Sequence, residues 1–173
     1  MYAVLTKILR KVFKEHTIFK YGFNISPMYR RSTGRVIAVT EDLLTAKVKI
    51  PLSIKNRNYV GSIFGGSLFS ATDPVFMIQL IHILGDAYVV WDKEATIRFR
   101  RPAKTDAYVV FSFSESEIET IKKRVAEERE IDLVKEIEIT DTSGDIVYAQ
   151  VVKTIYIADK EYYKNKRKTR KAV

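Results

Sequence analysis

The sequence contains no cysteine and only two histidines, His16 and His82, among its 173 residues. Without cysteine, a disulfide framework, a thiol nucleophile and a cysteine-ligated metal site are all excluded. Two histidines are too few for a multi-histidine metal centre, and we expect neither a metal ion nor another cofactor. The longest apolar run is interrupted by Asp73, Pro74 and Gln79, which argues against a membrane span.

We expect no secretory signal, because basic residues interrupt the apolar residues of the N-terminus. Apolar and basic side chains there follow helical spacing instead, which predicts an amphipathic helix over about residues 2–16, within an N-terminal segment 1–22. Packing of this helix against the protein's own sheet is favoured over binding to a membrane surface. We expect a cytoplasmic protein.

Positive charge is in excess, with a net charge of +9, and six of the last ten residues, starting at Lys164, are basic. Such a run could bind nucleic acid or an anionic surface. A frayed, solvated tail over residues 159–173 is the favoured interpretation. Because the charges elsewhere are mixed, we expect no nucleic-acid partner.

With 46% hydrophobic residues the chain is expected to form one domain with a sizeable core. Alternating patterns predict one hairpin turning at Glu41–Asp42 and another turning at Thr142–Gly144, whose second strand is apolar on both faces and therefore central. Two more strands are expected within residues 88–103, where Trp91 is read as a core residue, and within 106–114.

The remaining segments are read from their helix and loop signals. A charged helix is expected after Ser114 or Ser116, either of which suits an N-cap. Residues 21–34 contain glycine, asparagine and proline and predict an irregular linker.

The segment from Asn56 to Pro74 leads from a polar loop through glycines into an apolar helix, expected over residues 66–84 and ending at Gly85. Asp73 is its only formally charged residue from position 67 to position 81. A helix that is apolar on all sides belongs in a core, where an unpaired carboxylate is costly. We interpret the segment as a candidate active site, and one such helix in a mostly antiparallel sheet as an α+β arrangement.

This order of elements resembles the hotdog fold, in which a curved six-stranded antiparallel sheet wraps one long central helix. Within that fold the chain resembles the PaaI-like acyl-CoA thioesterases, and among them a subfamily described as a domain of unknown function. The resemblance covers residues 23–158. It rests on Asn56–Pro74, on residues 88–103, and on the Asp141–Gly144 turn with the "VVKTIYI" strand.

The thioesterase motif has an asparagine, a histidine six residues later, two glycines, and an acid nine residues after the histidine. Asn58, Gly65, Gly66 and Asp73 match it, whereas Phe64 stands at the histidine position. The resemblance implies that the substrate is acyl-CoA or another acyl thioester, and that Asp73, Gly65 and Asn58 are catalytic residues.

Backbone N–H groups at a helix start favour negative charge, and glycine lets a ligand approach them closely. Gly65 could therefore stabilise the oxyanion of a thioester, and we expect Gly66, Phe64 and Gly61 to contact the substrate. The alternative is a tight turn that needs glycine only for packing. Asn58 has a similar alternative, because loop asparagines often bond to the local backbone.

Asp73 could act as a general base or a nucleophile. Alternatively, Asp73 is an N-cap followed by Pro74 at the first helical position. On one helix Gly65 and Asp73 would lie about 12 Å apart, so one substrate carbonyl could not contact both. A site that uses both must combine two subunits, which implies a homodimer or homotetramer, as in hotdog enzymes with active sites at a dimer interface.

Three further functions compete with hydrolysis of a thioester. A non-catalytic acyl-CoA-binding or scaffold module is favoured by Phe64 and by the N-cap interpretation of Asp73. A dehydratase would need a catalytic histidine, and His82 is read instead as an ordinary core or surface residue. A nucleic-acid or membrane adaptor rests only on the basic ends.

Alternating Arg98 and Arg100, followed by Arg101, could hold coenzyme A phosphates or form a solvated face.

Overall fold

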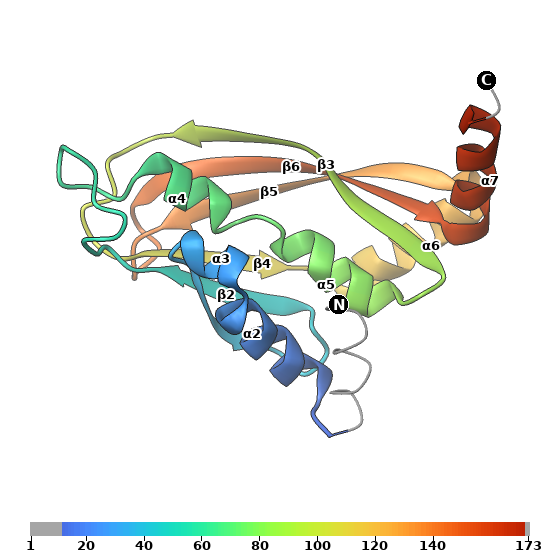
Figure 1. The fold of residues 1–173 in the computed structure, drawn as a ribbon, viewed down its shortest axis with the longest axis horizontal. Coiled ribbons are helices and arrows are strands. Elements are labelled where there is room, and N and C mark those ends of the chain that lie inside the picture. The colour runs from blue at the N-terminus through green and yellow to red at the C-terminus, as the bar shows by residue number, and fades with distance from the viewer. Residues whose placement is uncertain (1–11, 172–173) are drawn as a thin grey trace.

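Six antiparallel strands form one sheet that wraps a helical layer, as the computed structural model shows for residues 12–171 (Figure 1). The elements are α2 (Glu15–Ile25), α3 (Pro27–Arg31), β1 (Arg35–Val39), β2 (Thr45–Ile50), α4 (Gly65–Ser70), α5 (Val75–Leu84), β3 (Tyr88–Phe99), β4 (Ala107–Ser112), α6 (Glu115–Glu128), β5 (Glu130–Thr140), β6 (Val147–Asp159) and α7 (Lys160–Lys171).

The strands lie in the order β1-β2-β4-β5-β6-β3, so that β1 and β3 are the two edge strands. Both expected hairpins are present, as β1–β2 and β5–β6, and β6 is an interior strand. On the inner face, Val48, Val109 and Val151 are almost fully buried with α4 and α5 in a single core. The α+β arrangement expected from the sequence is therefore confirmed.

The apolar run forms two helices rather than the expected continuous one over residues 66–84. α4 ends at Ser70 and α5 begins at Val75, because proline at position 74 has no N–H to continue the helical ladder. Gly85, with a φ of 78°, ends α5 as expected. By length and a mean hydropathy of 1.3, the span Gly65–Leu84 could cross a membrane, but here it packs inside the sheet.

The segment expected to be an irregular linker, residues 21–34, is instead largely helical. It contains the end of α2 and all of α3, whose first residue is Pro27, a position at which proline favours a helix start. Phe19 and Phe23 of α2 are buried and tie it to the core. Most of the helix expected over residues 2–16 lies outside the described residues, and residues 12–14 are not helical.

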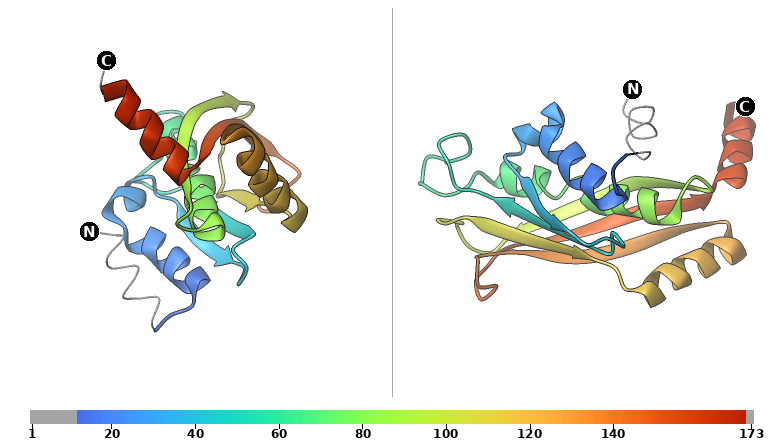
Figure 2. Two further views of the ribbon diagram at one scale, coloured as in Figure 1. Left: turned by 90° about the vertical axis from the view of Figure 1, so that its right-hand side faces the viewer. Right: turned by 90° about the horizontal axis from the view of Figure 1, so that it is seen from below.

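The C-terminal basic segment is a helix, α7, and not the frayed tail that we expected. Asp159 accepts a hydrogen bond from the Tyr162 N–H at 2.8 Å and so caps the start of α7. Lys166 forms an ion pair with Glu130 of β5 at 2.5 Å. Figure 2 shows α6 and α7 together at the end of the molecule opposite the loop that leads into α4.

Trp91 is 53% exposed, so its prediction as a core residue is wrong. The cause is an irregularity in β3, whose pairing with β6 shifts register between Asp92 and Glu94. One extra residue in a strand turns every side chain before it to the other face. The shift places Asp92 opposite the buried Ile155, on the inner face, and turns Trp91 outward.

Ser114 caps α6 as expected, by accepting a hydrogen bond from the Glu117 N–H.

Candidate active site

The centre of the site is a buried lysine. Lys153 lies on the inner face of β6 between Val151 and Ile155, and only 1% of its side chain is exposed. A lysine ammonium in such a place requires a partner of opposite charge. Two carboxyls supply it: Lys153 Nζ donates to Asp73 Oδ1 at 2.7 Å and to Asp92 Oδ2 at 2.8 Å.

Asp73 reaches Lys153 because it lies in the turn between α4 and α5 (Figure 1). Its side chain does not cap α5, which has no side-chain cap hydrogen bond. The N-cap interpretation of Asp73 is therefore wrong. With Lys153 holding one oxygen and 56% of the side chain exposed, the Asp73 carboxyl is both anchored and accessible.

The two carboxyls of the cluster have opposite pKa shifts. Burial alone would raise the pKa of Asp73, but hydrogen bonds from Lys153 and Asp92 outweigh burial and hold that pKa below its ordinary value. Burial raises the pKa of Asp92 above its ordinary value; Lys153 opposes that rise and the Asp73 carboxyl adds to it. Separated pKa values in a pair of acids are a frequent mark of functional sites.

The surroundings of Asp92 agree with these directions. Its Oδ1 is buried and has no hydrogen-bond partner within residues 12–171, which disfavours a second full negative charge in the cluster. Lys153, Asp73 and Asp92 thus form a cluster in which Asp73 is the more readily ionised and the more exposed carboxyl. It can accept a proton from water or attack an electrophile.

Gly65 and Gly66 open α4, and their N–H groups have no acceptor among the described residues. Their faces are covered, however. A side chain at Gly65 would meet the Phe99 ring, with Cβ only 2.6 Å from Cζ, and a side chain at Gly66 would overlap the Phe64 ring. Both rings are more than half exposed, so they can move aside toward solvent at the cost of their contacts with the start of α4.

Asn58 is occupied within its own loop. Its Oδ1 accepts hydrogen bonds from the N–H groups of Val60 and Ser62, and its Nδ2 donates to Ser62 Oγ at 2.9 Å. Gly61 lies in the same turn with a φ of 79°, which favours glycine. Asn58 and Gly61 therefore shape the loop before α4, and neither contacts the Lys153 cluster.

An apolar groove of about 730 Å³ runs between α2, α3 and α5. Phe19, Met28 and Ile78 are among its lining residues, and Pro74 also borders it, next to Asp73. Its size and lining are those of a site for a small apolar ligand or chain. His82, at the far end of α5, lines the groove, and its Nδ1 lies 2.6 Å from Glu15 Oε2, in agreement with its interpretation as an ordinary core or surface residue.

Neither Lys153 nor Asp92 was predicted from the sequence to be a site residue. Lys153 could have been found, because it is the one charged residue among the inward positions of β6 from Ala149 to Ile157. Asp92 could not be placed, because strict alternation along β3 puts it on the outer face. Arg98, on that outer face, and Arg100 and Arg101, after the strand, are exposed and not part of the cluster.

Comparison with solved structures shows which fold this is. A protein of unknown function from Pseudomonas aeruginosa, described as a probable thioesterase, is similar with a TM-score of 0.72 and 23% identity, over 83% of this chain and 95% of the other. A putative thioesterase from Shewanella oneidensis has a TM-score of 0.61 and 15% identity, over 83% and 96% of the two chains. The fold is the hotdog fold of the thioesterases.

A thioesterase from Haemophilus influenzae is also similar, with a TM-score of 0.59 and 10% identity, over 83% of this chain and 90% of the other. The family model for the domain of unknown function DUF4442 matches residues 15–157. The chain belongs to this family. No curated protein sequence matches the chain.

Proposed function

We propose that the protein hydrolyses an acyl-CoA-type thioester, with the active site at a homodimer interface and Asp73 as the general base. The single observation that carries this proposal is the Asp73 carboxylate, ionised, 56% exposed and held by the buried Lys153. The thioesterases with the same fold support the choice of a thioester substrate.

In the proposed reaction, the Asp73 carboxylate takes a proton from water as the water oxygen attacks the thioester carbonyl carbon. The oxyanion that forms accepts hydrogen bonds from the N–H groups of Gly65 and Gly66. The carbon–sulfur bond then breaks, and the thiolate takes the proton from Asp73. Lys153 keeps Asp73 ionised between turnovers and fixes its orientation, and Asp92 shares this positioning role.

The second subunit enters because Asp73 and Gly65 lie at opposite ends of the α4 segment. β3 is an edge strand of twelve residues with exposed Trp91 and Phe99 on it, and such an edge is a natural place for pairing with a second copy. Pairing there would bring Gly65 of one subunit toward Asp73 of the other. The apolar groove next to Pro74 offers room for an acyl chain, and we place the reaction in the cytoplasm.

The second candidate is a non-catalytic acyl-CoA-binding or scaffold module. It is favoured by the rings of Phe64 and Phe99, which cover the glycines in this conformation. In that case Asp73 and Asp92 would serve only to neutralise Lys153.

Asp73→Asn separates the two functions. Asparagine still accepts a hydrogen bond from Lys153 but cannot take a proton, so we expect turnover to fall by about 10²–10⁴. Stability should change by only about 1 kcal/mol, because asparagine keeps the hydrogen bond from Lys153 and Asp92 remains beside Lys153 as its partner of opposite charge. The measurement is hydrolysis of short, medium, long and aromatic acyl-CoAs, beside thermal melts.

The matched control is Asp106→Asn, which removes an aspartate paired with Lys49 at 2.7 Å outside the site and should keep full activity. Asp73→Ala removes the acceptor as well, and should cost a further 1–3 kcal/mol or so of unfolding free energy. A wild type inactive on the whole panel would support the binding module. An active wild type with an equally active Asp73→Asn variant would refute the carboxylate mechanism.

A further inference from the structure

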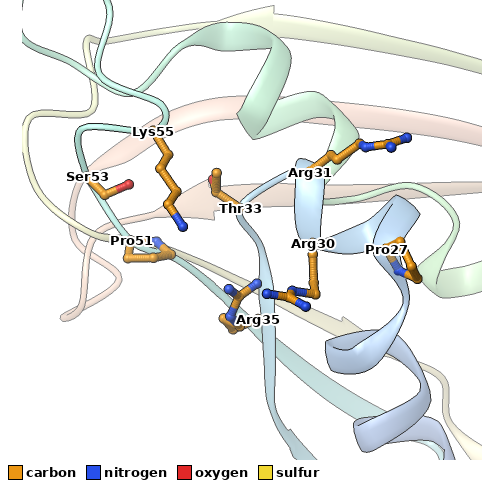
Figure 3. A pocket seen from close by; sticks show the side chains of 8 residues that line it. All are labelled: Pro27, Arg30, Arg31, Thr33, Arg35, Pro51, Ser53 and Lys55. Atoms are coloured by element: carbon orange, nitrogen blue, oxygen red, sulfur yellow. The ribbon is translucent and has the colours of Figure 1, made fainter.

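A second cavity, of about 490 Å³, lies between α3, the start of β1 and the loop after β2. Four of its eight lining residues are basic and none is acidic: Arg30, Arg31, Arg35 and Lys55. None of the four forms an ion pair within residues 12–171. Figure 3 shows Arg30, Arg35 and Lys55 directed into this cavity, with Arg31 extending away from the other three.

Holding four basic side chains around one cavity is unfavourable in the empty protein, because their positive charges repel one another. The same arrangement concentrates a positive potential that attracts an anion. Arginine presents paired donors to phosphate oxygens, and lysine adds a compact charge. The hydroxyls of Thr33 and Ser53 supply further hydrogen-bonding groups at the wall.

The walls of this cavity are held in place by buried contacts. Asn56, which is 4% exposed, donates from Nδ2 to Thr33 Oγ1 at 2.8 Å and accepts at Oδ1 from the Ser53 N–H at 2.9 Å. Thr33 has a φ of 66°, a strained conformation for a β-branched residue that is often found at functional sites. Arg35 is oriented by a hydrogen bond to the Gly34 carbonyl at 2.9 Å.

Two further hydrogen bonds connect the surroundings of the cavity to the candidate active site. The carbonyl of Asn56 accepts a hydrogen bond from the Phe64 N–H at 2.7 Å, immediately before Gly65. On the other side, Tyr29 of α3 donates to the carbonyl of Ala71 at 2.9 Å, in the turn that carries Asp73. Segments that border the cavity are therefore hydrogen-bonded to both ends of α4.

We propose that this basic pocket binds the phosphate groups of the nucleotide part of coenzyme A, and so selects coenzyme A thioesters over those of other carriers. This inference rests on the proposed function for its choice of ligand. The phosphates bind between Arg30, Arg35 and Lys55, and the pantetheine arm extends from there toward Asp73.

The test is equilibrium binding of free coenzyme A, measured by titration calorimetry, to the wild type and to Arg35→Gln, Lys55→Gln and the double variant. Each lost charge-assisted contact should weaken binding by about tenfold or more. Pantetheine, which lacks the phosphates, should bind the wild type and the variants equally weakly. Lys123→Gln removes one exposed charge of α6 and should bind coenzyme A like the wild type. Thermal melts check that each variant is folded.

Further titrations identify the source of the phosphate. Inorganic phosphate that binds the wild type as tightly as coenzyme A would overturn the nucleotide assignment in favour of an adventitious ion only. Binding of a phosphopantetheine-bearing carrier protein, with Lys55 required and coenzyme A not bound, would overturn it in favour of that carrier. Unchanged binding of coenzyme A by the double variant would overturn the pocket itself.

Because these titrations need no turnover, they also separate this inference from the proposed hydrolysis. Pocket-dependent binding of coenzyme A without hydrolysis would support the pocket and refute the enzyme. Hydrolysis by the double variant with an unaltered KM for acyl-CoA would support the enzyme and refute the pocket.

Discussion

At the scale of the residue, the cluster of Lys153, Asp73 and Asp92 combines one positive charge with two acids in a largely buried place. One ionised acid neutralises Lys153, and the second has no cation of its own. That imbalance explains why the pKa of Asp73 is lowered while burial raises the pKa of Asp92. The more exposed of the two acids keeps its charge where a substrate can reach it.

The raised pKa of Asp92 predicts a pH dependence of stability. The folded protein holds the Asp92 proton more tightly than the unfolded chain does, so this group favours folding at low pH and loses that contribution as pH rises above 3.8, its ordinary value. Because asparagine does not titrate, Asp92→Asn abolishes this fall in the unfolding free energy. Between about pH 4 and the folded pKa, the variant should gain on the wild type by up to about 1.4 kcal/mol per pH unit in unfolding free energy.

Urea unfolding at several pH values from 4 to 7 measures this difference for both proteins. The slopes of the unfolding free energy against pH are compared, because the substitution also changes contacts whose energy does not depend on pH. Thr96→Ala, at an exposed position of β3 that does not titrate, is the control and should run parallel to the wild type. Parallel curves for Asp92→Asn as well would show that Asp92 titrates alike in the folded and unfolded protein.

At the scale of the element, two irregularities build the site. Pro74 interrupts the central helix, and the resulting turn brings Asp73 to Lys153. The register shift in β3 turns Asp92 inward to the same lysine. Regular versions of both elements would leave Lys153 without either partner, which agrees with the frequent occurrence of bulges beside active sites.

The start of α4 carries a prediction of its own. Gly65→Val should lower turnover by about 10²–10³, by blocking access to an oxyanion donor. It should also lower the melting temperature, because the new Cβ would lie 2.6 Å from the Phe99 ring. Adding Phe99→Ala makes room and should restore the melting temperature without restoring turnover.

Phe99→Ala alone is the control for this pair of effects, since it opens the face of Gly65 and leaves its N–H in place. Hydrolysis and thermal melts of the three variants give the measurement. Recovery of turnover together with stability in the double variant would show that Gly65 is needed for packing only.

At the scale of the whole molecule, a site shared between subunits predicts complementation. Asp73→Asn and Gly65→Val homodimers each have two defective sites. In a mixed dimer, one site combines the intact Gly65 of one subunit with the intact Asp73 of the other. Random mixing should therefore restore about a quarter of wild-type activity.

The experiment co-refolds equal amounts of the two variants, with each variant refolded alone as the control, and follows acyl-CoA hydrolysis. Sedimentation of the wild type should give at least twice the 20.0 kDa mass of the chain. If each site lies within one subunit, mixing restores nothing, since every site keeps its own defect. A monomeric wild type would end the shared-site proposal directly.

The sequence alone was sufficient to predict the sheet, its hairpins and the apolar run inside it, because these follow from local alternation and from the glycine and turn signals between strands. It also singled out Asp73, as the one charge in that run. Local pattern was enough because each of these features is encoded within a few neighbouring residues.

The residues that surround Asp73 could not be predicted in this way, because they come from distant segments of the chain. Lys153 of β6 is 80 positions from Asp73 and 61 positions from Asp92 of β3 in the chain. The side of the sheet that Asp92 faces depends on a register shift in the pairing of β3 with β6. The same shift turned Trp91 outward. Pairing register is set by contacts between distant strands, so alternation along β3 alone could reveal neither residue's place.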